Sequence, residues 1–473
     1  MISDEIVQLF KDALSDDDRA VTDAVDLAPK LTDWRGRIRG ASRLMLQPAS
    51  AASLAAIVKL AGETRTPLVP QGGNTGLVGG GIPEADGRAV LVSLERMNRI
   101  RSIDPAGNTA TVEAGVILQA LHEAAAAEDR MFPLSLGAKG SATIGGLIST
   151  NAGGTQVLRY GTMRAQVLGL EAVLPDGDIL NQLTPLRKDN TGYDIKQLLI
   201  GAEGTLGFVT AASLRLLPAP REIATALVGL KSPAAALPLM SRLRQATGDQ
   251  LDSFELMPRD AITLVLRHVD GTRDPLQEAQ PWYVLVETTS SVAGTQLRET
   301  LESALAEELE KGGIQDAAIA QSEGQREEFW HLRESIAEAE KADGLSLKHD
   351  VSVSVTDMPA FMAKATKRIE ARWPGARILA FGHLGDGNIH FNVRSDERLP
   401  RDRLMELKDE VAAFTYDEVA SFGGSISAEH GIGTLKAGEL LRLGDPGKLA
   451  AMRAVKAALD PHGIMNPGKI FAA

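Results

Sequence analysis

Apolar residues recur at two different spacings along residues 1–217. Short apolar runs between glycine, proline or polar clusters predict strands, and apolar positions three or four apart predict helices. The predicted strands lie within 44–50, 66–73, 89–94, 108–115, 167–180 and 204–217. The predicted helices lie at 51–62 and 116–128. Residues 142–154 are rich in glycine and show neither period, so this part is predicted to be β/α with glycine-rich loops.

A second alternation of strands and helices follows Pro218 and Pro220, which predict a domain boundary. The predicted strands are 222–230, 251–257, 282–289, 348–355, 376–383 and 388–393, and the predicted helices are 232–246, 295–312, 326–342, 357–372 and 401–422. This order predicts an α+β domain over 218–420, a sheet with helices on one face. A shorter segment, 421–473, holds one more predicted helix at 448–460.

Composition narrows the classes of protein that fit this pattern. The 473 residues include no cysteine, which excludes disulfides, thiolate metal sites, iron–sulfur clusters and cysteinyl cofactors. The net charge of −12 argues against a general nucleic-acid binder, whose surface would be basic. No signal peptide or membrane-spanning run is visible, so a cytoplasmic location is expected.

Three glycine-rich stretches, 70–83, 135–154 and 201–208, carry almost no charge. Successive glycines let backbone N–H groups point into one concavity, which binds anions without cationic side chains. Three glycine-rich surface loops are the alternative interpretation. No Rossmann G-x-G-x-x-G follows a first strand and no Walker sequence is present, which disfavours nicotinamide or ATP binding.

The stretch 383–390 predicts a hairpin that carries two histidines. Asp386-Gly387 is a strong signal for a two-residue turn, and such a turn places His383 directly opposite His390. Two neutral imidazoles in that arrangement could share one metal ion, whereas the alternative is a polar surface pair. Glu429 could add a carboxylate and leave an open coordination position, as catalytic zinc sites require.

The neighbouring His430 would point away from Glu429 in a straight strand. Gly431 and Gly433 permit a bend at this place, which would allow both side chains to face one site. Histidine has a pKa near neutrality, as a general base for a hydroxyl proton requires.

Two cations lie on patterned elements. Arg333 falls in the apolar stripe of Phe329 and Ile336, where it either forms a buried salt bridge or clamps a carboxylate. Lys348 lies on the polar face of an alternating strand and is either solvated or a second anion contact.

These motifs together resemble one family. The stretches 70–80, 136–154, 170–180, 189–210, 382–393, 427–436 and 466–471 occur in the order found in the FAD-linked oxidases of the p-cresol methylhydroxylase/vanillyl-alcohol oxidase superfamily. The resemblance covers residues 38–473 and is closest to the D-2-hydroxyacid dehydrogenase branch, which includes D-2-hydroxyglutarate and D-lactate dehydrogenases and the FAD subunit of glycolate oxidase.

The resemblance implies an α+β fold in three parts. An FAD-binding domain of p-cresol methylhydroxylase type would occupy 1–217 and an antiparallel-sheet substrate domain 218–420, and the segment 421–473 would return to the flavin. It implies that FAD is held by residues of the glycine-rich motifs. These are Pro70, Gly72, Gly73, Asn74, Thr75, Gly76, Gly80, Ser141, Gly145, Gly146, Thr150, Asn151, Gly153, Gly154, Glu203, Gly204, Val209 and Asn466. With no cysteine, and His122 outside those motifs, the FAD is expected to be non-covalent.

The resemblance also assigns roles in the reaction. It implies a divalent metal, zinc being favoured, on His383, His390 and Glu429, with His430 as catalytic base. The implied substrate contacts are Arg333, Lys348 and Asn392.

The implied reaction oxidises a D-2-hydroxy acid, with D-2-hydroxyglutarate favoured. D-lactate or glycolate oxidation is the alternative, because Ala337 stands where the hydroxyglutarate pattern has threonine. A flavin-binding subunit without its own activity is a further alternative. Electrons would pass to a separate acceptor, an electron-transfer flavoprotein, a cytochrome or a quinone, and a homodimer is compatible with this reading.

Overall fold

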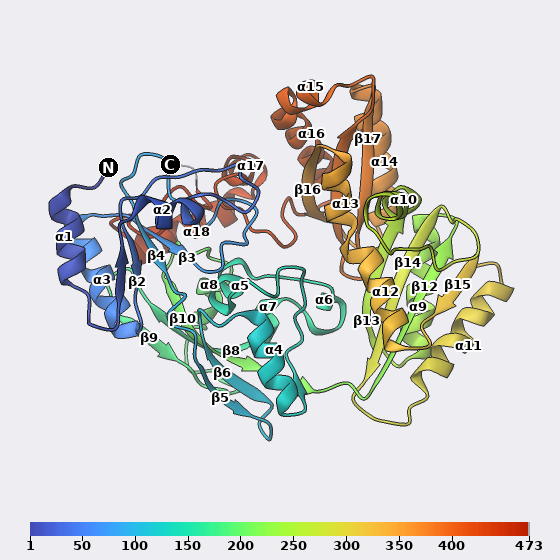
Figure 1. Cartoon of the computed structure of the whole chain (residues 1–473), viewed down its shortest axis with the longest axis horizontal. Coiled ribbons are helices and arrows are strands. Elements are labelled where there is room, and N and C mark those ends of the chain that lie inside the picture. The colour runs from blue at the N-terminus through green and yellow to red at the C-terminus, as the bar shows by residue number, and fades with distance from the viewer. Residues whose placement is uncertain (472–473) are drawn as a thin grey trace. The chain divides into compact units, whose positions relative to one another are not determined.

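The computed structural model describes residues 1–471, which form two compact units (Figure 1). The first unit contains Met1–Gly153, Thr162–Ala219 and the segment from Glu429 onward. The second contains Gly154–Gly161 and Pro220–Ala428. The chain therefore leaves the first unit twice, once for eight residues and once for the whole of the second sheet.

The first unit is built on two sheets. A four-stranded sheet has the order β1-β2-β4-β3, and its last three strands run parallel. An antiparallel sheet has the order β5-β6-β10-β8-β9, and β7 pairs with β11 separately. The strands are β1 Arg19–Val21, β2 Met45–Gln47, β3 Leu68–Gln71, β4 Val90–Ser93, β5 Ile100–Asp104, β6 Thr109–Glu113, β7 Arg130–Met131, β8 Val167–Val173, β9 Ile179–Gln182, β10 Phe208–Arg215 and β11 Leu217–Pro218.

The helices of this unit cover the two sheets. They are α1 Asp4–Asp12, α2 Ala24–Leu27, η1 Ala28–Leu31, α3 Ala51–Thr64, α4 Leu118–Ala127, α5 Ile144–Thr150, α7 Met163–Gln166, α8 Lys196–Leu199, α17 Ala437–Leu443 and α18 Pro446–Leu459. Ser50 caps α3, and Arg65 ends it in the left-handed region. The buried face of α3, with Leu54 and Ile57, packs in one apolar cluster with Leu68 of β3 and Val90 of β4. This packing fixes the strand from which the first glycine-rich loop departs.

The second unit is a seven-stranded antiparallel sheet of order β15-β12-β14-β13-β17-β18-β16. Its strands are β12 Glu222–Leu230, β13 Leu251–Pro258, β14 Trp282–Ser290, β15 Asp316–Ile319, β16 Ser346–Ser352, β17 Ala376–His383 and β18 Asn388–Ser395. Its helices are α6 Val157–Tyr160, η2 Pro233–Ala235, α9 Ala236–Ala246, α10 Arg259–His268, α11 Leu297–Glu310, α12 Glu323–Glu334, α13 Ile336–Asp343, α14 Met358–Arg372, η3 Leu384–Asp386, α15 Arg401–Glu406 and α16 Lys408–Ser421.

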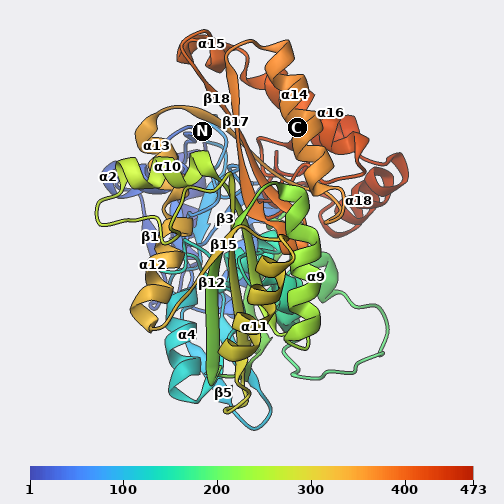
Figure 2. The ribbon, with the colours of Figure 1, turned by 90° about the vertical axis from the view of Figure 1, so that its right-hand side faces the viewer.

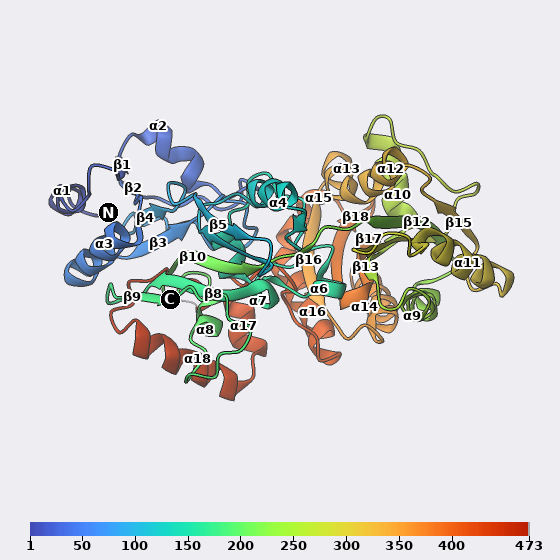
Figure 3. The ribbon, with the colours of Figure 1, turned by 90° about the horizontal axis from the view of Figure 1, so that it is seen from below.

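Helices cover both faces of this sheet, so the expectation of one covered face is wrong. Figures 2 and 3 show α10, α12 and α13 on one side of the strands and α9, α14 and α16 on the other. Because side chains alternate along a strand, Leu227 and Leu285 pack with the first group of helices. The intervening residues of the same strands, such as Val228 and Val286, are also fully buried. A sheet with two apolar faces needs two layers of helix.

Two segments without a clear sequence signal are helical, and one predicted helix is divided. The glycine-rich stretch contains α5, whose Ile144 and Ile148 are fully buried. A Cβ at Gly145 would lie 2.6 Å from the Cβ of Ala114, so the glycine that hides the helical pattern permits the close packing. Helix α10 was not predicted, and the predicted helix 326–342 consists of α12 and α13, which meet at Ser335.

Candidate functional site

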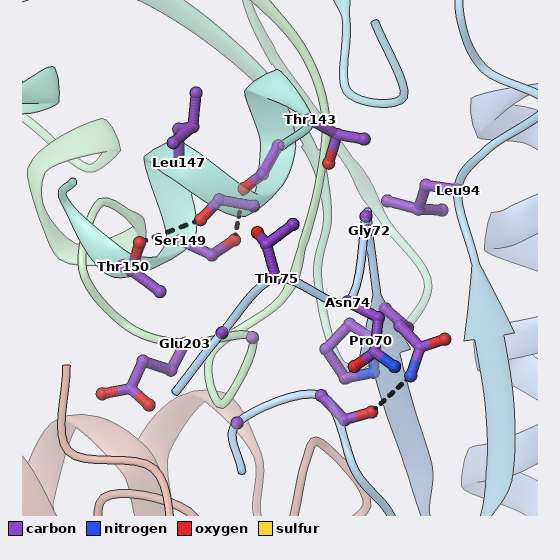
Figure 4. Close-up of a pocket in the computed structure, with 18 of the residues that line it drawn as sticks. Pro70, Gly72, Asn74, Thr75, Leu94, Thr143, Leu147, Ser149, Thr150 and Glu203 are labelled. Carbon is purple, nitrogen blue, oxygen red and sulfur yellow. Dashed lines mark hydrogen bonds between the residues drawn. The ribbon is translucent and has the colours of Figure 1, made fainter. Parts of the chain in front are cut away.

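A cavity of about 1030 Å³, including its open mouth, lies in the first unit. Figure 4 shows its two principal walls: the loop after β3, with Gly72, Asn74 and Thr75, and helix α5 with its preceding residue Thr143. The other lining residues come mainly from the loop 78–82 and the segment 203–209.

The loop after β3 presents backbone donors to the cavity. Within residues 1–471, the N–H groups of Gly73, Asn74, Thr75 and Gly76 have no hydrogen-bond acceptor. Asn74 has a positive φ of 53°, and its side chain donates to the carbonyl oxygens of Thr32 and Pro29, so it contributes its backbone rather than its amide. Successive N–H groups with no acceptor in the protein form an anion site that fits a pyrophosphate.

The glycines of this wall leave no room for a larger residue. A Cβ at Gly73 would lie 1.9 Å from the carbonyl oxygen of Ser141, and one at Gly72 would lie 2.2 Å from Oγ1 of Thr143. That hydroxyl is itself buried and has no hydrogen-bond partner among the described residues. The cradle therefore combines glycine backbone, an unused hydroxyl and unused N–H donors, and these groups fit a dinucleotide cofactor such as FAD.

Glu203 connects this cavity to the last part of the chain. Its side chain is 7% exposed, and its two oxygens accept the backbone N–H groups of Ile432 and Gly433 at 2.7 Å each. Burial raises the pKa of Glu203 above its usual range, against the two N–H groups that favour the charged form. Asn466 donates to the carbonyl oxygens of Glu203 and Gly80 at 2.7 and 3.0 Å. Glu203 thus holds the segment that contains His430.

His430 lines the cavity together with the glycine loop. The bend that the sequence allows is present, because Gly431 and Gly433 have φ of +80° and +53°. A Cβ at Gly431 would lie 2.8 Å from the Glu203 carboxylate, and one at Gly433 would lie 2.2 Å from the carbonyl oxygen of Val78. Both glycines are therefore needed for the path that directs His430 to the cavity.

The structure places most of the predicted cofactor residues on this wall. The lining includes Pro70, Gly72, Gly73, Asn74, Thr75, Gly76, Gly80, Gly145, Gly146, Thr150, Glu203, Gly204 and Val209. It does not include Ser141, Asn151, Gly153, Gly154 or Asn466. Asn151 ends α5 with a positive φ, and its Oδ1 accepts the N–H of Arg164, whereas Gly154 belongs to the second unit. Sequence reasoning missed Thr143, Ser149 and Phe208, which also line the cavity.

The second unit contains the predicted histidine hairpin, with a different register. Phe381, not His383, pairs with His390, so the loop has four residues, η3 and Gly387, instead of two. A 3₁₀ turn precedes Gly387, which takes the left-handed conformation. The predicted two-residue turn would have required this conformation at Asp386 as well. The histidines are diagonal neighbours on one face, and their ring centroids are 5.5 Å apart.

Glu255, which the sequence analysis did not select, bridges two predicted site residues. It lies on β13 directly opposite His383 and has no exposed surface. Its Oε1 lies 2.5 Å from Nδ1 of His383, and its Oε2 accepts Nε of Arg333 at 2.8 Å. Burial alone would raise the pKa of Glu255, but the charges of His383 and Arg333 outweigh it and lower the pKa to about 2. With Nδ1 in contact with Glu255, Nε2 is the ring nitrogen of His383 that could bind a metal ion.

The predicted substrate cations both have carboxylate partners. Arg333 is buried, with its guanidinium 5.1 Å from the ring of Phe381, and it forms the salt bridge with Glu255 that was one of the two expectations. Lys348 and Asn392 are paired across β16 and β18. Lys348 Nζ forms an ion pair with Oε2 of Glu340 at 3.0 Å, and Asn392 Nδ2 donates to the same oxygen at 2.9 Å. These residues share the face of the sheet that α12 and α13 cover.

Comparison with known proteins places this arrangement in a family. Residues 42–182 match a family described as an FAD binding domain, and residues 219–470 match one described as FAD linked oxidases, C-terminal domain. The chain belongs to the FAD-linked oxidases. It is an FAD-dependent dehydrogenase, as the resemblance implied. Within residues 1–471, no helix combines the length and apolarity needed to cross a membrane.

Its relatives include enzymes named for one substrate. The mitochondrial D-2-hydroxyglutarate dehydrogenases of Arabidopsis thaliana and Bos taurus are each 40% identical to this oxidase. The matches cover 98% and 96% of this chain and 81% of each relative. A D-2-hydroxyglutarate–pyruvate transhydrogenase of Saccharomyces cerevisiae is 35% identical, covering 99% of this chain and 95% of the relative.

Solved structures confirm the predicted fold. Substrate-bound p-cresol methylhydroxylase has a TM-score of 0.75 at 17% identity, covering 99% of this chain and 96% of the other. The 4-ethylphenol oxidase of Gulosibacter chungangensis has a TM-score of 0.73 at 19% identity, covering 100% and 98%. At these identities the likeness establishes the fold alone.

Gly76→Ala tests the cavity wall. A Cβ at Gly76 meets no protein atom within 4 Å, so the variant should fold with an unchanged melting temperature. The methyl group would occupy the space that a bound dinucleotide approaches, and FAD affinity should fall at least ~10-fold, or by about 1.4 kcal/mol. Titration of the flavin-free protein with FAD measures this. Gly140→Ala is the control, because Gly140 is equally uncrowded and does not line the cavity; equal affinity in the two variants would remove the loop from the FAD site.

Proposed function

We propose that this dehydrogenase oxidises D-2-hydroxy acids, with D-2-hydroxyglutarate as the favoured substrate and 2-oxoglutarate as its product. The observation that carries the proposal is His430, a base that lines the same cavity as the glycine wall for FAD. The names of the relatives supply the substrate class.

His430 is the proposed catalytic base. FAD, when bound, supplies an acceptor for the hydride of the carbon that carries the hydroxyl group. His430 takes the hydroxyl proton, and an imidazole has a pKa suited to this near neutral pH. The N–H groups of Ile432 and Gly433 donate to the Glu203 carboxylate and limit the movement of the segment, so the imidazole is oriented before the substrate arrives.

We also propose that His383, His390 and Glu429 hold a divalent metal, with zinc favoured. Two observations in the second unit support a metal: the imidazoles lie close together, and Glu255 occupies Nδ1 of His383 as an outer-shell carboxylate. Ser425 is bridged to Ser352, which pairs with Asn388 at the start of β18. Glu429 is four residues further on, within about 14 Å of chain. The ion would polarise the hydroxyl and carboxylate oxygens of the substrate.

The substrate contacts follow from the same face of the sheet. Arg333 uses Nε for Glu255, and within the described part of the chain its two terminal nitrogens have no acceptor, so they can hold a carboxylate in a fork. Lys348 and Asn392 are proposed to contact the rest of the acid. Electrons would pass to a separate acceptor, an electron-transfer flavoprotein, a cytochrome or a quinone. D-lactate is the second candidate substrate, because Ala337 removes a hydroxyl one turn after Arg333.

The substrate is tested by anaerobic mixing of the FAD-loaded protein with D-2-hydroxyglutarate, D-lactate, glycolate and the L-enantiomers. D-2-hydroxyglutarate should bleach the flavin fastest, whereas the L-acids should leave it oxidised. Bleaching by none of these acids would contradict the proposal.

His430→Ala should reduce the bleaching rate about 10²–10⁴-fold, because the hydroxyl proton loses its acceptor. FAD content should remain that of the wild type, since the bonds to Glu203 are made by backbone groups at 432 and 433, which the substitution keeps. His122→Ala is a matched control, because that imidazole bonds the carbonyl oxygen of Leu134 and does not line the cavity. An unchanged rate in His430→Ala would exclude it as the base.

His390→Ala should lose the metal and the activity together. Elemental analysis of the purified variant measures the first, and flavin bleaching measures the second. Exhaustive chelation of the wild type should have the same effect, reversed by adding zinc. Full activity in chelated protein that contains no metal would contradict the proposed ion.

Glu255→Gln should weaken metal binding about 10–100-fold, which is the usual effect of removing an outer-shell carboxylate. The amide can no longer accept from both His383 and Arg333, so the KM for the acid should rise as well. Competition with a chromophoric chelator measures the affinity. Glu287→Gln is the control, because Glu287 is a buried carboxylate of the same sheet that bonds Arg326 and Trp330. Equal metal affinity in the two variants would contradict the role of Glu255.

A further inference from the structure

Glu340 is a buried carboxylate whose role the proposed reaction leaves unexplained. It lies on α13, which Figure 3 shows above the strands of the second sheet, and its side chain has no exposed surface. Its Oε2 accepts a hydrogen bond from Asn392 Nδ2 at 2.9 Å and forms an ion pair with Lys348 Nζ at 3.0 Å. Two of the three proposed substrate contacts are therefore in contact with this one oxygen.

The second oxygen of Glu340 lacks a partner. Within residues 1–471, Oε1 is buried and accepts no hydrogen bond. A buried acceptor without a partner destabilises the fold by about the free energy of removing that group from water, and this penalty is larger when the group is charged. An apolar residue would avoid this cost, and a glutamine would leave Lys348 without a counter-charge, so a carboxylate at this position indicates that its charge matters.

The effect of that charge falls on Lys348. The lysine side chain is 23% exposed, and it reaches inward to a carboxylate that is fully enclosed. An ion pair this close removes most of the positive potential that Lys348 would offer to an incoming anion. Arg333 is similarly paired with Glu255, so each proposed cation already faces a carboxylate of the protein.

We propose that Glu340 is a specificity-determining residue that limits selectivity for a second substrate carboxylate. Resting on the proposed function, this means that the enzyme accepts D-2-hydroxy acids with an uncharged end at rates comparable to the dicarboxylate. A dianion must compete with Glu340 for Lys348, whereas an uncharged end leaves the Glu340–Lys348 pair intact. The proposed substrate class therefore includes D-2-hydroxy acids whose far end is uncharged as well as those that carry a second carboxylate there.

Two acids of equal length separate charge from size. D-2-hydroxyglutarate and D-2-hydroxypentanoate differ only in a carboxylate or a methyl group at C5. For the wild type, their kcat/KM values should lie within ~10-fold of each other. Glu340→Gln keeps the size of the side chain and one acceptor for Lys348 or Asn392, but removes the charge. The ratio of kcat/KM, dicarboxylate to monocarboxylate, should then rise by about 10-fold, chiefly through a lower KM for the dicarboxylate.

A second variant, Glu340→Met, provides the same test if Glu340→Gln does not fold. Glu340→Met places an apolar chain of similar length in the buried position and should raise the ratio as well, because it removes the same charge. Lys348 is 23% exposed, so its ammonium can be hydrated once its partner is gone. In the double variant Glu340→Gln/Lys348→Met the increase should disappear, since the cation on which it depends is absent. Glu287→Gln should leave the ratio at the wild-type value, as that carboxylate bonds Arg326, Trp330 and Thr225 instead.

The outcomes distinguish this inference from the proposed function. A ratio that stays constant or falls in both Glu340 variants, with both acids still oxidised, would overturn the role of Glu340 and leave the reaction intact. An absence of flavin bleaching by either acid in the wild type would overturn the reaction itself. Melting temperature and FAD content of each variant establish that the rates refer to folded, loaded enzyme.

Discussion

The hydrogen bonds of the Glu203 carboxylate to the N–H groups of Ile432 and Gly433 are the interaction on which the first unit's site depends. They join a residue beside the glycine cavity to a segment 229 positions later in the chain. Asn466 adds a second connection, from Glu203 and Gly80 to the C-terminal part. If the carboxylate were lost, the two buried N–H groups would lack acceptors, at about 1–3 kcal/mol each, and the path of His430 would no longer be determined.

Buried carboxylates have the same organising role in the second unit. Glu255 orients His383 and Arg333, and Glu340 holds Lys348 and Asn392. All three carboxylates are at most 7% exposed. In each case the carboxylate contacts donor groups or cations of the protein itself. An acidic protein can thus hold negative charge away from its surface, against its own donors.

Much of this architecture could be predicted from the sequence, because the patterns that specify it are local. The parallel strands and α3 have clear apolar periods, and the glycine motifs indicate where the backbone approaches a ligand. Helix α5 could not be predicted, since its small residues serve close packing against Ala114 and hide the period. The predicted hairpin register was wrong: the strand partner of His390 is Phe381, two residues before His383. The 3₁₀ turn before Gly387 depends on backbone geometry that Asp-Gly alone does not specify.

Glu255 and Glu340 show the limit of sequence reasoning more clearly. Glu255 lies within an apolar strand, 128 positions from His383, and only the pairing of β13 with β17 brings them together. Glu340 follows Arg333 by two helical turns and looks like one of several acidic residues on a solvated helix. Long-range register decides which of those acids is enclosed, and a single sequence carries no local signal for it. The glycine-motif residues that line the cavity could therefore be found from the sequence, whereas Glu255 and Glu340 required the folded sheet.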